Sequence, residues 1–349
     1  MEVQMRYGIF AFGALGLLAL ASVPLSGQST AKPPVASSAK SAVVPRTADG
    51  QPDLQGIWDF RTVTPLERPA EFADKPTLTD QEAAEYEKKA VESRNADRNR
   101  DKKQRAVVNG TAETGDVALA YNDFWWDRGT KVIGTKRTSL IVDPPDGRIP
   151  PLTPEGKKRT ERQDIARERP AWGPEDRSVG ERCISGFNSG PPMLPGGYNQ
   201  NVQIFQIPGY VVLVNEMVHN ARVVPTDGRP HLNGGVRQWA GDSRGHWEGN
   251  TFVIDTTNFY DTTSFRGSSP SLHLTERFTR VNASTLLYEF TVNDPKTWTR
   301  PWTVQVPMTQ TEGPLYEYAC HEGNYGMEGL LKGARAVEQR EGTTRSSSK

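Results

Sequence analysis

The 349-residue chain carries 42 Lys and Arg against 42 Asp and Glu, so its formal net charge is zero. This balance argues against nucleic acid or an anionic membrane as the main partner, because both select a basic protein surface. The 32 glycines and 26 prolines indicate many turns and loops rather than a helical protein.

The N-terminal 27 residues have the features of a secretory signal peptide. Arg6 precedes an apolar run over residues 9–23, which is too short to span a bilayer comfortably, and Pro24 marks its end. An uncleaved membrane anchor is the alternative. Residues 28–50, rich in Ala, Ser, Lys and Pro, predict a flexible linker. We therefore expect a periplasmic or secreted protein with no stable membrane insertion after signal cleavage.

Two polar helical insertions are predicted in the first half of the folded part. A capping box at Thr79 opens a strongly charged helix over about residues 79–105. An N-cap at Thr153, followed by a first-turn proline, opens a second helix over about residues 154–168. Both helices are too polar to enter a core, so we expect them at the periphery of the fold.

The folded part as a whole is expected to be a single domain over residues 51–340, and most of it has the alternation and turn spacing of short strands. Gly249 and Asn250 suit a two-residue hairpin loop. The predicted strands cover residues 53–60, 137–142, 202–207, 210–215, 222–225, 236–240, 246–248, 251–255, 272–281, 285–292, 303–308 and 315–320. This spacing predicts a mainly β fold, either an antiparallel β-barrel or a strongly curved sheet, with a disordered tail over residues 341–349.

Cys183 and Cys320 are the only cysteines, and both lie in the part expected to be exported. An oxidising compartment favours a disulfide between them, which would close a long loop. Two buried free thiols are the alternative, since sequence cannot supply the geometry of the pair. Two cysteines alone do not make a four-ligand zinc site.

Five segments together resemble a family of secreted bacterial proteins of unknown function that is frequent in soil and marine genomes. The segments cover residues 52–58, 137–148, 181–183, 247–251 and 319–325, and the likeness extends from about residue 53 to residue 338. This resemblance implies no activity. Gly56 and Trp58 are also similar to the Gly-x-Trp of the first strand in lipocalin-type barrels, where it closes the barrel floor. That second resemblance implies a lipocalin-like fold and nothing about function.

All five histidines lie between residues 203 and 325, among many carboxylates and aromatic side chains. A neutral imidazole beside a carboxylate is suited to acid–base chemistry near neutral pH. The candidate catalytic pairs are Glu216 with His219, His246 with Glu248, and His321 with Glu322. Each pair has a structural alternative, which is a solvated turn for the first, an exposed hairpin for the second and a disulfide anchor for the third.

The spacing of these residues gives no support for a metal or a cofactor. The chain has no His-x-His, His-Glu-x-x-His or Cys-x-x-Cys pattern. A glycine-rich phosphate loop and a Gly-x-Ser-x-Gly nucleophile motif are also absent. We therefore expect no metal site and no cofactor.

Aromatic and arginine side chains provide an independent signal for ligand binding. The candidates are Trp125, Trp126, Tyr198, Arg222, Trp239, Trp247, Arg300, Trp302 and Tyr325. The alternative is that the tryptophans fill the core. We predict an exported protein that binds a small aromatic or sugar-like molecule in an aromatic-lined polar pocket. The rival hypothesis is a hydrolase, lyase or isomerase that uses a His–carboxylate pair in the same pocket, and a purely structural envelope role ranks last.

Overall fold

The computed structural model describes residues 44–95, 97, 107–108, 111–112, 122–261 and 265–347. The predicted signal peptide and most of the predicted linker lie outside these residues, as do most residues after 95 of the first predicted helix. None of the described helices combines the length and apolar character that a membrane span requires.

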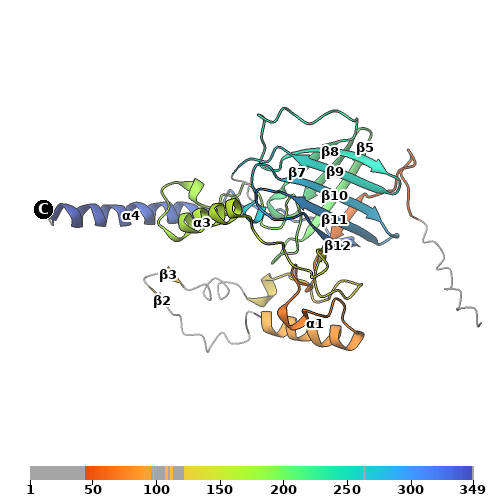
Figure 1. Ribbon diagram of the computed structural model, residues 1–349, viewed down its shortest axis with the longest axis horizontal. Coiled ribbons are helices and arrows are strands. Elements are labelled where there is room, and N and C mark those ends of the chain that lie inside the picture. The colour runs from red at the N-terminus through yellow and green to blue at the C-terminus, as the bar shows by residue number, and fades with distance from the viewer. Residues whose placement is uncertain are drawn as a thin grey trace, which may run out of the picture. The chain divides into compact units, whose positions relative to one another are not determined.

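A single sheet of ten strands forms the body of the described chain (Figure 1). Its strands are β1 (Gly56–Asp59), β4 (Ile141–Asp143), β5 (Asn201–Ile207), β6 (Tyr210–Asn215), β7 (Ala221–Pro225), β8 (Asp242–Glu248), β9 (Thr251–Thr257), β10 (His273–Arg280), β11 (Thr285–Asn293) and β12 (Trp302–Thr311). The order across the sheet is β7-β6-β5-β1-β12-β11-β10-β9-β8, with β4 paired to β12. Every pair in this sheet runs antiparallel. Strands β2 (Val107–Val108) and β3 (Thr111–Ala112) form a separate antiparallel pair.

The large sheet is curved but open. Its edges are β7 and β8, and no ladder between described residues joins them, so the barrel alternative is not formed. The edges nevertheless approach each other, because a Cβ atom on Gly245 of β8 would lie 2.9 Å from Cγ1 of Val224 on β7. The prediction of a mainly β fold with a curved antiparallel sheet is confirmed, whereas the lipocalin-like likeness stays a prediction.

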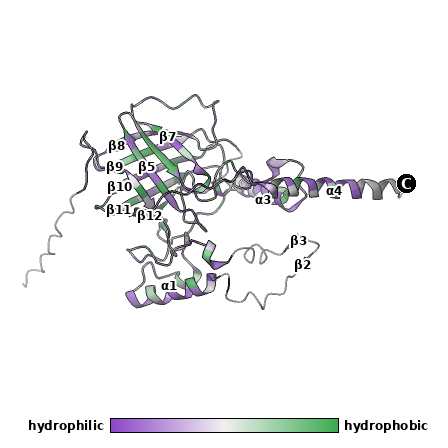
Figure 2. Ribbon diagram, turned by 180° about the vertical axis from the view of Figure 1, so that it is seen from behind, coloured by the Kyte–Doolittle hydropathy of each residue, from purple (hydrophilic) through white to green (hydrophobic). Residues whose placement is uncertain are grey.

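Alternation along the strands explains which face of the sheet is buried. In β10 and β11 every second residue is buried, as the two-residue period of a strand requires. Figure 2 shows the resulting mixture of hydrophilic and hydrophobic residues along the strands. The largest side chains of the core are Trp58, Phe60, Phe252, Phe259, Phe278, Tyr288, Phe290 and Trp302. The indole of Trp58 donates to the carbonyl of Leu54 at 2.8 Å, and the guanidinium of Arg280 lies 4.6 Å from its ring centre.

A buried ion pair crosses the inside of the curve. Arg222 of β7 donates to both carboxylate oxygens of Glu276 on β10, and the hydroxyl of Tyr288 donates to the same carboxylate at 2.7 Å. The side chains of Arg222 and Glu276 are only 9% and 0% exposed. Burial lowers the pKa of Arg222, but the charge and hydrogen bonds of Glu276 more than offset this and hold that pKa above its ordinary value. These groups therefore satisfy one another inside the fold.

The two predicted helices begin where their sequence signals indicate. Helix α1 (Asp80–Arg94) follows a capping box in which Thr79 and Glu82 each accept a hydrogen bond from the other's backbone. Helix α3 (Pro154–Glu168) follows Thr153, whose hydroxyl accepts from the backbone of Gly156 at 3.0 Å. Helix α4 (Tyr325–Ser347) has no counterpart among the predicted elements, and it runs through most of the segment 341–349 that was expected as a tail.

Two predicted strands are wrong. Residues 236–240 belong to the long connection from β7 to β8, and only an isolated bridge between Gln238 and Phe259 touches them. The connection crosses from one edge of the sheet to the other, and residues 236–240 do not pair with β7. Residues 315–320 form no strand either, and β12, the strand before them, is already paired with β1, β4 and β11.

Candidate functional site

The candidate site lies where β1 ends and β5 begins. The two strands are paired there, with Asp59 opposite Asn201. Three loops meet at this end of the sheet, over residues 60–66, 122–133 and 194–200, together with the last turn of α1. Backbone bonds join the loops: the amide of Val63 donates to Lys131, and the amide of Asp127 donates to Gly197, at 2.9 and 2.8 Å.

Local chemistry fixes the loop over residues 126–133. Gly129 has a φ of +72°, and a Cβ atom there would lie 2.9 Å from the backbone nitrogen of Thr62. Only glycine therefore suits this close approach of two backbones. On the other side, the carboxylate of Glu87 in α1 accepts from Lys131 Nζ at 2.8 Å and from the amide of Val132 at 3.0 Å. The loop is thus tied both to the end of β1 and to α1.

An aromatic pocket of about 200 Å³ opens beside this loop, lined by Trp125, Trp126, Tyr198, Asn199 and Tyr318. The rings of Trp126 and Tyr198 are 5.8 Å apart, and those of Tyr198 and Tyr318 are stacked at 6.0 Å with an interplanar angle of 27°. Three of the residues predicted to bind ligand thus meet in one place. Such a set of ring faces can hold a planar molecule by stacking.

Small and amide residues shape the aromatic pocket. A Cβ atom on Gly197 would lie 2.9 Å from the ring of Trp126, so glycine lets the indole approach the backbone. Asn199 has a φ of 51°, in the left-handed region that asparagine tolerates better than most residues. The buried side chain of Asn188 donates to the carbonyls of Tyr198 and Asn199 at 2.9 and 3.1 Å. The side chain of Asn188 therefore fixes the backbone of the turn that carries Tyr198.

The disulfide supports the opposite wall. Cys183 and Cys320 are bonded, as predicted, across 137 residues of chain. The amide of Cys320 donates to the carbonyl of Tyr318 at 2.9 Å. The amide of Tyr316 donates to Oε1 of Glu216 at 3.2 Å. The crosslink and the buried carboxylate together hold Tyr318 in a segment that has no strand partner.

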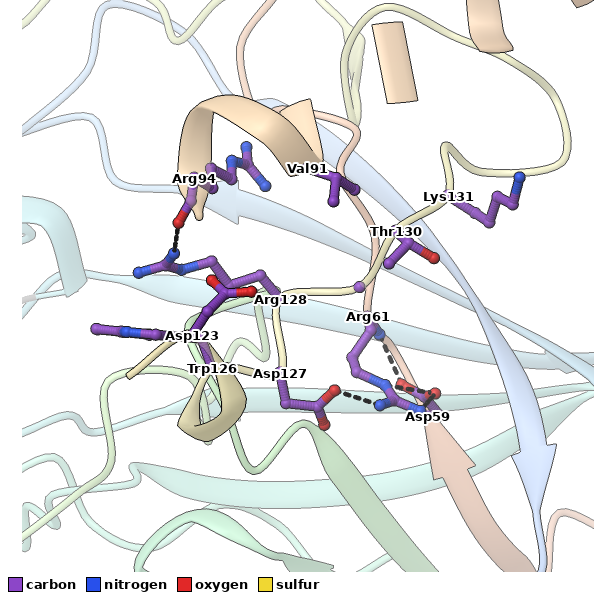
Figure 3. A pocket seen from close by; sticks show the side chains of 11 residues that line it. Asp59, Arg61, Val91, Arg94, Asp123, Trp126, Asp127, Arg128, Thr130 and Lys131 are labelled. Atoms are coloured by element: carbon purple, nitrogen blue, oxygen red, sulfur yellow. Dashed lines mark hydrogen bonds and ion pairs between the residues drawn. The ribbon is translucent and has the colours of Figure 1, made fainter. Parts of the chain in front are cut away.

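A charged pocket of about 360 Å³ shares Trp126 with the aromatic pocket. Figure 3 shows Arg61 held between Asp59 and Asp127, which keep its pKa above the ordinary value. Arg128 behaves differently. Its guanidinium lies 3.7 Å from the ring centre of Trp126 and donates to the backbone carbonyl of Arg94 at 2.9 Å. Burial, followed by the charge of Arg94, lowers the pKa of Arg128, and only Asp123 acts in the opposite direction.

A third and larger cavity, here called the arginine pocket, has a volume of about 630 Å³. It shares Arg94 and Arg128 with the charged pocket. The remaining lining residues are Thr62, Thr64, Pro65, Leu66, Ser93, Asn95, Leu140, Leu194, Pro195, Gly196, Gly197 and Arg266. The three cavities therefore surround one short segment, Trp126 to Arg128.

The predicted catalytic pairs lie elsewhere. Glu216 is buried, and besides Tyr316 its carboxylate accepts from Asn201 Nδ2 at 2.8 Å, whereas His219 is exposed. Among the described residues no hydrogen bond joins these two side chains. His246 and Glu248 are in contact, with Nε2 and Oε1 3.1 Å apart, but both face solvent.

The third pair lies beside the disulfide. Nε2 of His321 is 2.8 Å from the carbonyl of Cys183, and Glu322 is exposed. In the same region Asn324 donates to the carbonyl of Glu181 at 2.9 Å. His321 thus helps to hold the crosslinked segment. None of the six candidate catalytic residues lines the aromatic pocket.

The other predicted ligand residues are spread over the molecule. Arg222 is engaged by Glu276, and Trp302 is fully buried in the core, so neither offers a free face to a ligand. Trp247 lines a separate cavity of about 330 Å³, and Trp239 packs on Tyr260 with their ring centres 4.7 Å apart. Arg300 pairs with Asp143 at 2.9 Å, and Tyr325 is 77% exposed at the start of α4.

The sequence analysis missed a chain of alternating carboxylates and imidazoles at the β8 edge. His231 contacts Asp242 through Nδ1 at 3.0 Å and Asp255 through Nε2 at 3.2 Å, and Asp255 contacts His273 at 2.8 Å. Strand pairing of Leu274 with Thr256 brings His273 beside Asp255, and this register was the signal that could have revealed the pair. Within the described residues, no group of three or more His, Cys, Asp or Glu is placed to hold a metal ion.

Comparisons with known proteins were made at the level of family, sequence and structure. No family model matches the chain, and no similar curated protein or solved structure is found. The family resemblance of the five segments therefore stays a prediction. Function has to be argued from the geometry of the site.

Proposed function

We propose that this is an exported protein that binds a small planar molecule in the aromatic pocket. The observation that carries the proposal is the convergence of Trp126, Tyr198 and Tyr318, which come from three separate segments and present their rings to one cavity. The volume of about 200 Å³ suits one ring system. Ring faces and a nearby amide are the usual means by which proteins hold such a ligand.

Export is supported by the disulfide. A bond between Cys183 and Cys320 persists in an oxidising compartment, whereas cytosolic thiols are kept reduced. This agrees with the predicted signal peptide and with a periplasmic or secreted location. Catalysis is less well supported, because the His–carboxylate pairs lie at separate places outside the aromatic pocket.

The test is fluorescence titration with N-phenyl-1-naphthylamine, a neutral probe whose naphthyl ring system is planar. We expect saturable binding to the mature protein, weakened about threefold to tenfold by Trp125→Ala and by Tyr318→Ala, the range for loss of one aromatic contact. Trp172→Ala is the matched control, because Trp172 is 71% exposed and lies outside the aromatic pocket. Equal affinity in the wild type and both pocket variants would refute stacking at this site.

A further inference from the structure

The charged residues among the described lining of the arginine pocket are all positive. Arg94, Arg128 and Arg266 line it, and none of its described lining residues is Asp or Glu. The chain as a whole is neutral, so this segregation is not a consequence of a basic composition. A cavity that gathers charges of one sign concentrates the field on a ligand of the opposite sign.

Within the described part of the chain, these arginines differ from Arg61 in having no carboxylate partner. Among the described residues no carboxylate lies within ion-pair distance of Arg94, Arg128 or Arg266, whereas Arg61 in the adjoining charged pocket is held by two carboxylates. The Arg128 guanidinium donates a hydrogen bond to the backbone carbonyl of Arg94. Arg94 and Arg266 are exposed to solvent at the pocket, and guanidinium groups can make several charge-assisted bonds to an oxyanion, so these side chains are accessible to a dissolved anion.

The protein partly desolvates two of the three guanidinium groups. Burial lowers the pKa of Arg128 and of Arg266, which means that the charged form is less well solvated than in water. Arg94 adds like-charge repulsion to Arg128, while Glu67 and Asp123 compensate only in part. Arg266 also has φ 50° and ψ 40°, a left-handed conformation that an arginine rarely adopts. Bound negative charge would relieve the electrostatic cost.

Part of the lining of the arginine pocket, here called its floor, is apolar. It is formed by Pro65, Leu66, Leu140, Leu194 and Pro195. Leu140 is 1% exposed and belongs to the core, so the floor is continuous with the packed interior. A volume of about 630 Å³ lies within the range of sites for organic molecules.

We propose that the arginine pocket binds an apolar organic anion, with the apolar body on the leucine and proline floor and an oxyanion such as a carboxylate held by Arg94, Arg128 and Arg266. This site is distinct from the stacking site, because none of the described residues that line the arginine pocket also lines the aromatic pocket. The proposal therefore does not depend on the function argued above.

Isothermal titration of the mature protein with octanoate tests it, with 1-octanol as the neutral analogue of equal length. We expect Arg94→Gln and Arg266→Gln each to weaken octanoate binding about tenfold, the factor for one charge-assisted hydrogen bond, and to change 1-octanol binding less than about twofold. Arg229→Gln is the matched control, since it removes the same charge from an exposed turn that lines none of the three cavities. Octanoate binding should also weaken as salt is added.

Three results would overturn the proposal: no saturable octanoate binding by the wild type, equal affinity in the wild type and both arginine variants, or sulfate binding as tightly as octanoate. The last result would show a site for inorganic anions only. Tyr318→Ala separates the two proposals, because it should weaken N-phenyl-1-naphthylamine and leave octanoate unchanged. Failure of one probe with success of the other therefore identifies which proposal is wrong.

Discussion

Arginine serves opposite purposes in two regions of this protein. Inside the curved sheet, Arg222 is sealed and bonded to both oxygens of Glu276. At the end of the sheet, Arg94 and Arg266 line a cavity with no carboxylate partner among the described residues. The first arrangement uses charge to join two distant strands, and the second leaves charge available. An arginine is therefore informative about binding only when its partners are known, which sequence does not give.

The two regions should also differ in how strongly the folding stability depends on their arginines. A buried pair contributes little by forming but costs much when one partner is removed, because an uncompensated charge is left behind. Replacing a pocket arginine that has no carboxylate partner leaves no uncompensated charge behind, so it should cost little folding stability. The stability of the interior and the affinity of the pockets can therefore be changed separately.

The largest effect should come from removing the crosslink that holds the pocket end. Cys183→Ser with Cys320→Ser opens a loop with a separation of 137 residues, which costs about 5 kcal/mol in the chain-entropy account. Urea denaturation of both proteins measures the loss. We also expect weaker N-phenyl-1-naphthylamine binding, because Tyr318 lies two residues from Cys320. A loss below about 1 kcal/mol would show that the segment is held mainly by other contacts.

The second-largest loss of stability should come from breaking the buried pair of Arg222 and Glu276. Glu276→Gln should lower the free energy of unfolding by about 3–5 kcal/mol, because Arg222 would be buried without a counter-charge. Glu248→Gln is the control: it removes a carboxylate that is 48% exposed and paired with Arg277, and should cost less than about 1 kcal/mol. If Arg222→Met with Glu276→Leu recovers most of the loss, the cost belongs to the unpaired charge. Equal losses in the two single variants would contradict the contrast drawn here.

Local signals predicted most of the sheet. Strand β6 coincides with its predicted range, and the hairpin at Gly249 and Asn250 has the expected two-residue loop, because alternation and turn chemistry act over a few residues. The predicted strands at 236–240 and 315–320 fail because pairing is decided by distant strands. Whether an extended segment finds a neighbour depends on which edges are already occupied.

The site was predicted only in part for the same reason. Trp126 and Tyr198 were nominated by residue type, and the disulfide by compartment, but Tyr318 and Arg266 were not. These two join the site through the return of the chain after β12 and the loop before β10, which no local pattern encodes. Conversely, Trp302 and Arg222 are of residue types that often bind ligands, yet the fold places them in the interior.

The pair of Asp255 and His273 is partly exposed. Its contribution to stability should lie between that of the buried Arg222–Glu276 pair and that of the pocket arginines. Asp255 raises the pKa of His273 through a hydrogen bond and its charge, against the effect of burial. The charged imidazole is thus favoured by folding, and this stabilisation is complete below the unfolded pKa of about 6.5 and is lost as pH rises through the higher folded pKa. His231 and Asp242 continue the same chain of contacts.

His273→Gln should therefore lose its destabilising effect as pH rises from about 6 to about 8. Because the side chains are 42% and 34% exposed, we expect a difference below about 1 kcal/mol at the acid end. Urea denaturation at several pH values measures it, with His246→Gln as an exposed control. A difference from wild type that is independent of pH would mean that the imidazole contributes packing rather than charge.

The smallest effect on stability is expected where the effect on binding is largest. Arg266→Gln breaks no ion pair with a described residue and removes a partly desolvated charge, so without ligand the free energy of unfolding should stay within about 0.5 kcal/mol of wild type. Octanoate at about 100 times the wild-type dissociation constant should then stabilise the wild type by about 2.7 kcal/mol and the tenfold weaker variant by about 1.4 kcal/mol, because only the folded state binds. Arg222→Gln should show the reverse behaviour, with a large loss of stability and no specific loss of ligand-induced stabilisation in the molecules that remain folded. If Arg266→Gln proved as destabilising as Arg222→Gln in the absence of ligand, Arg266 would be a structural residue, and the division between sealed and available arginines would fail.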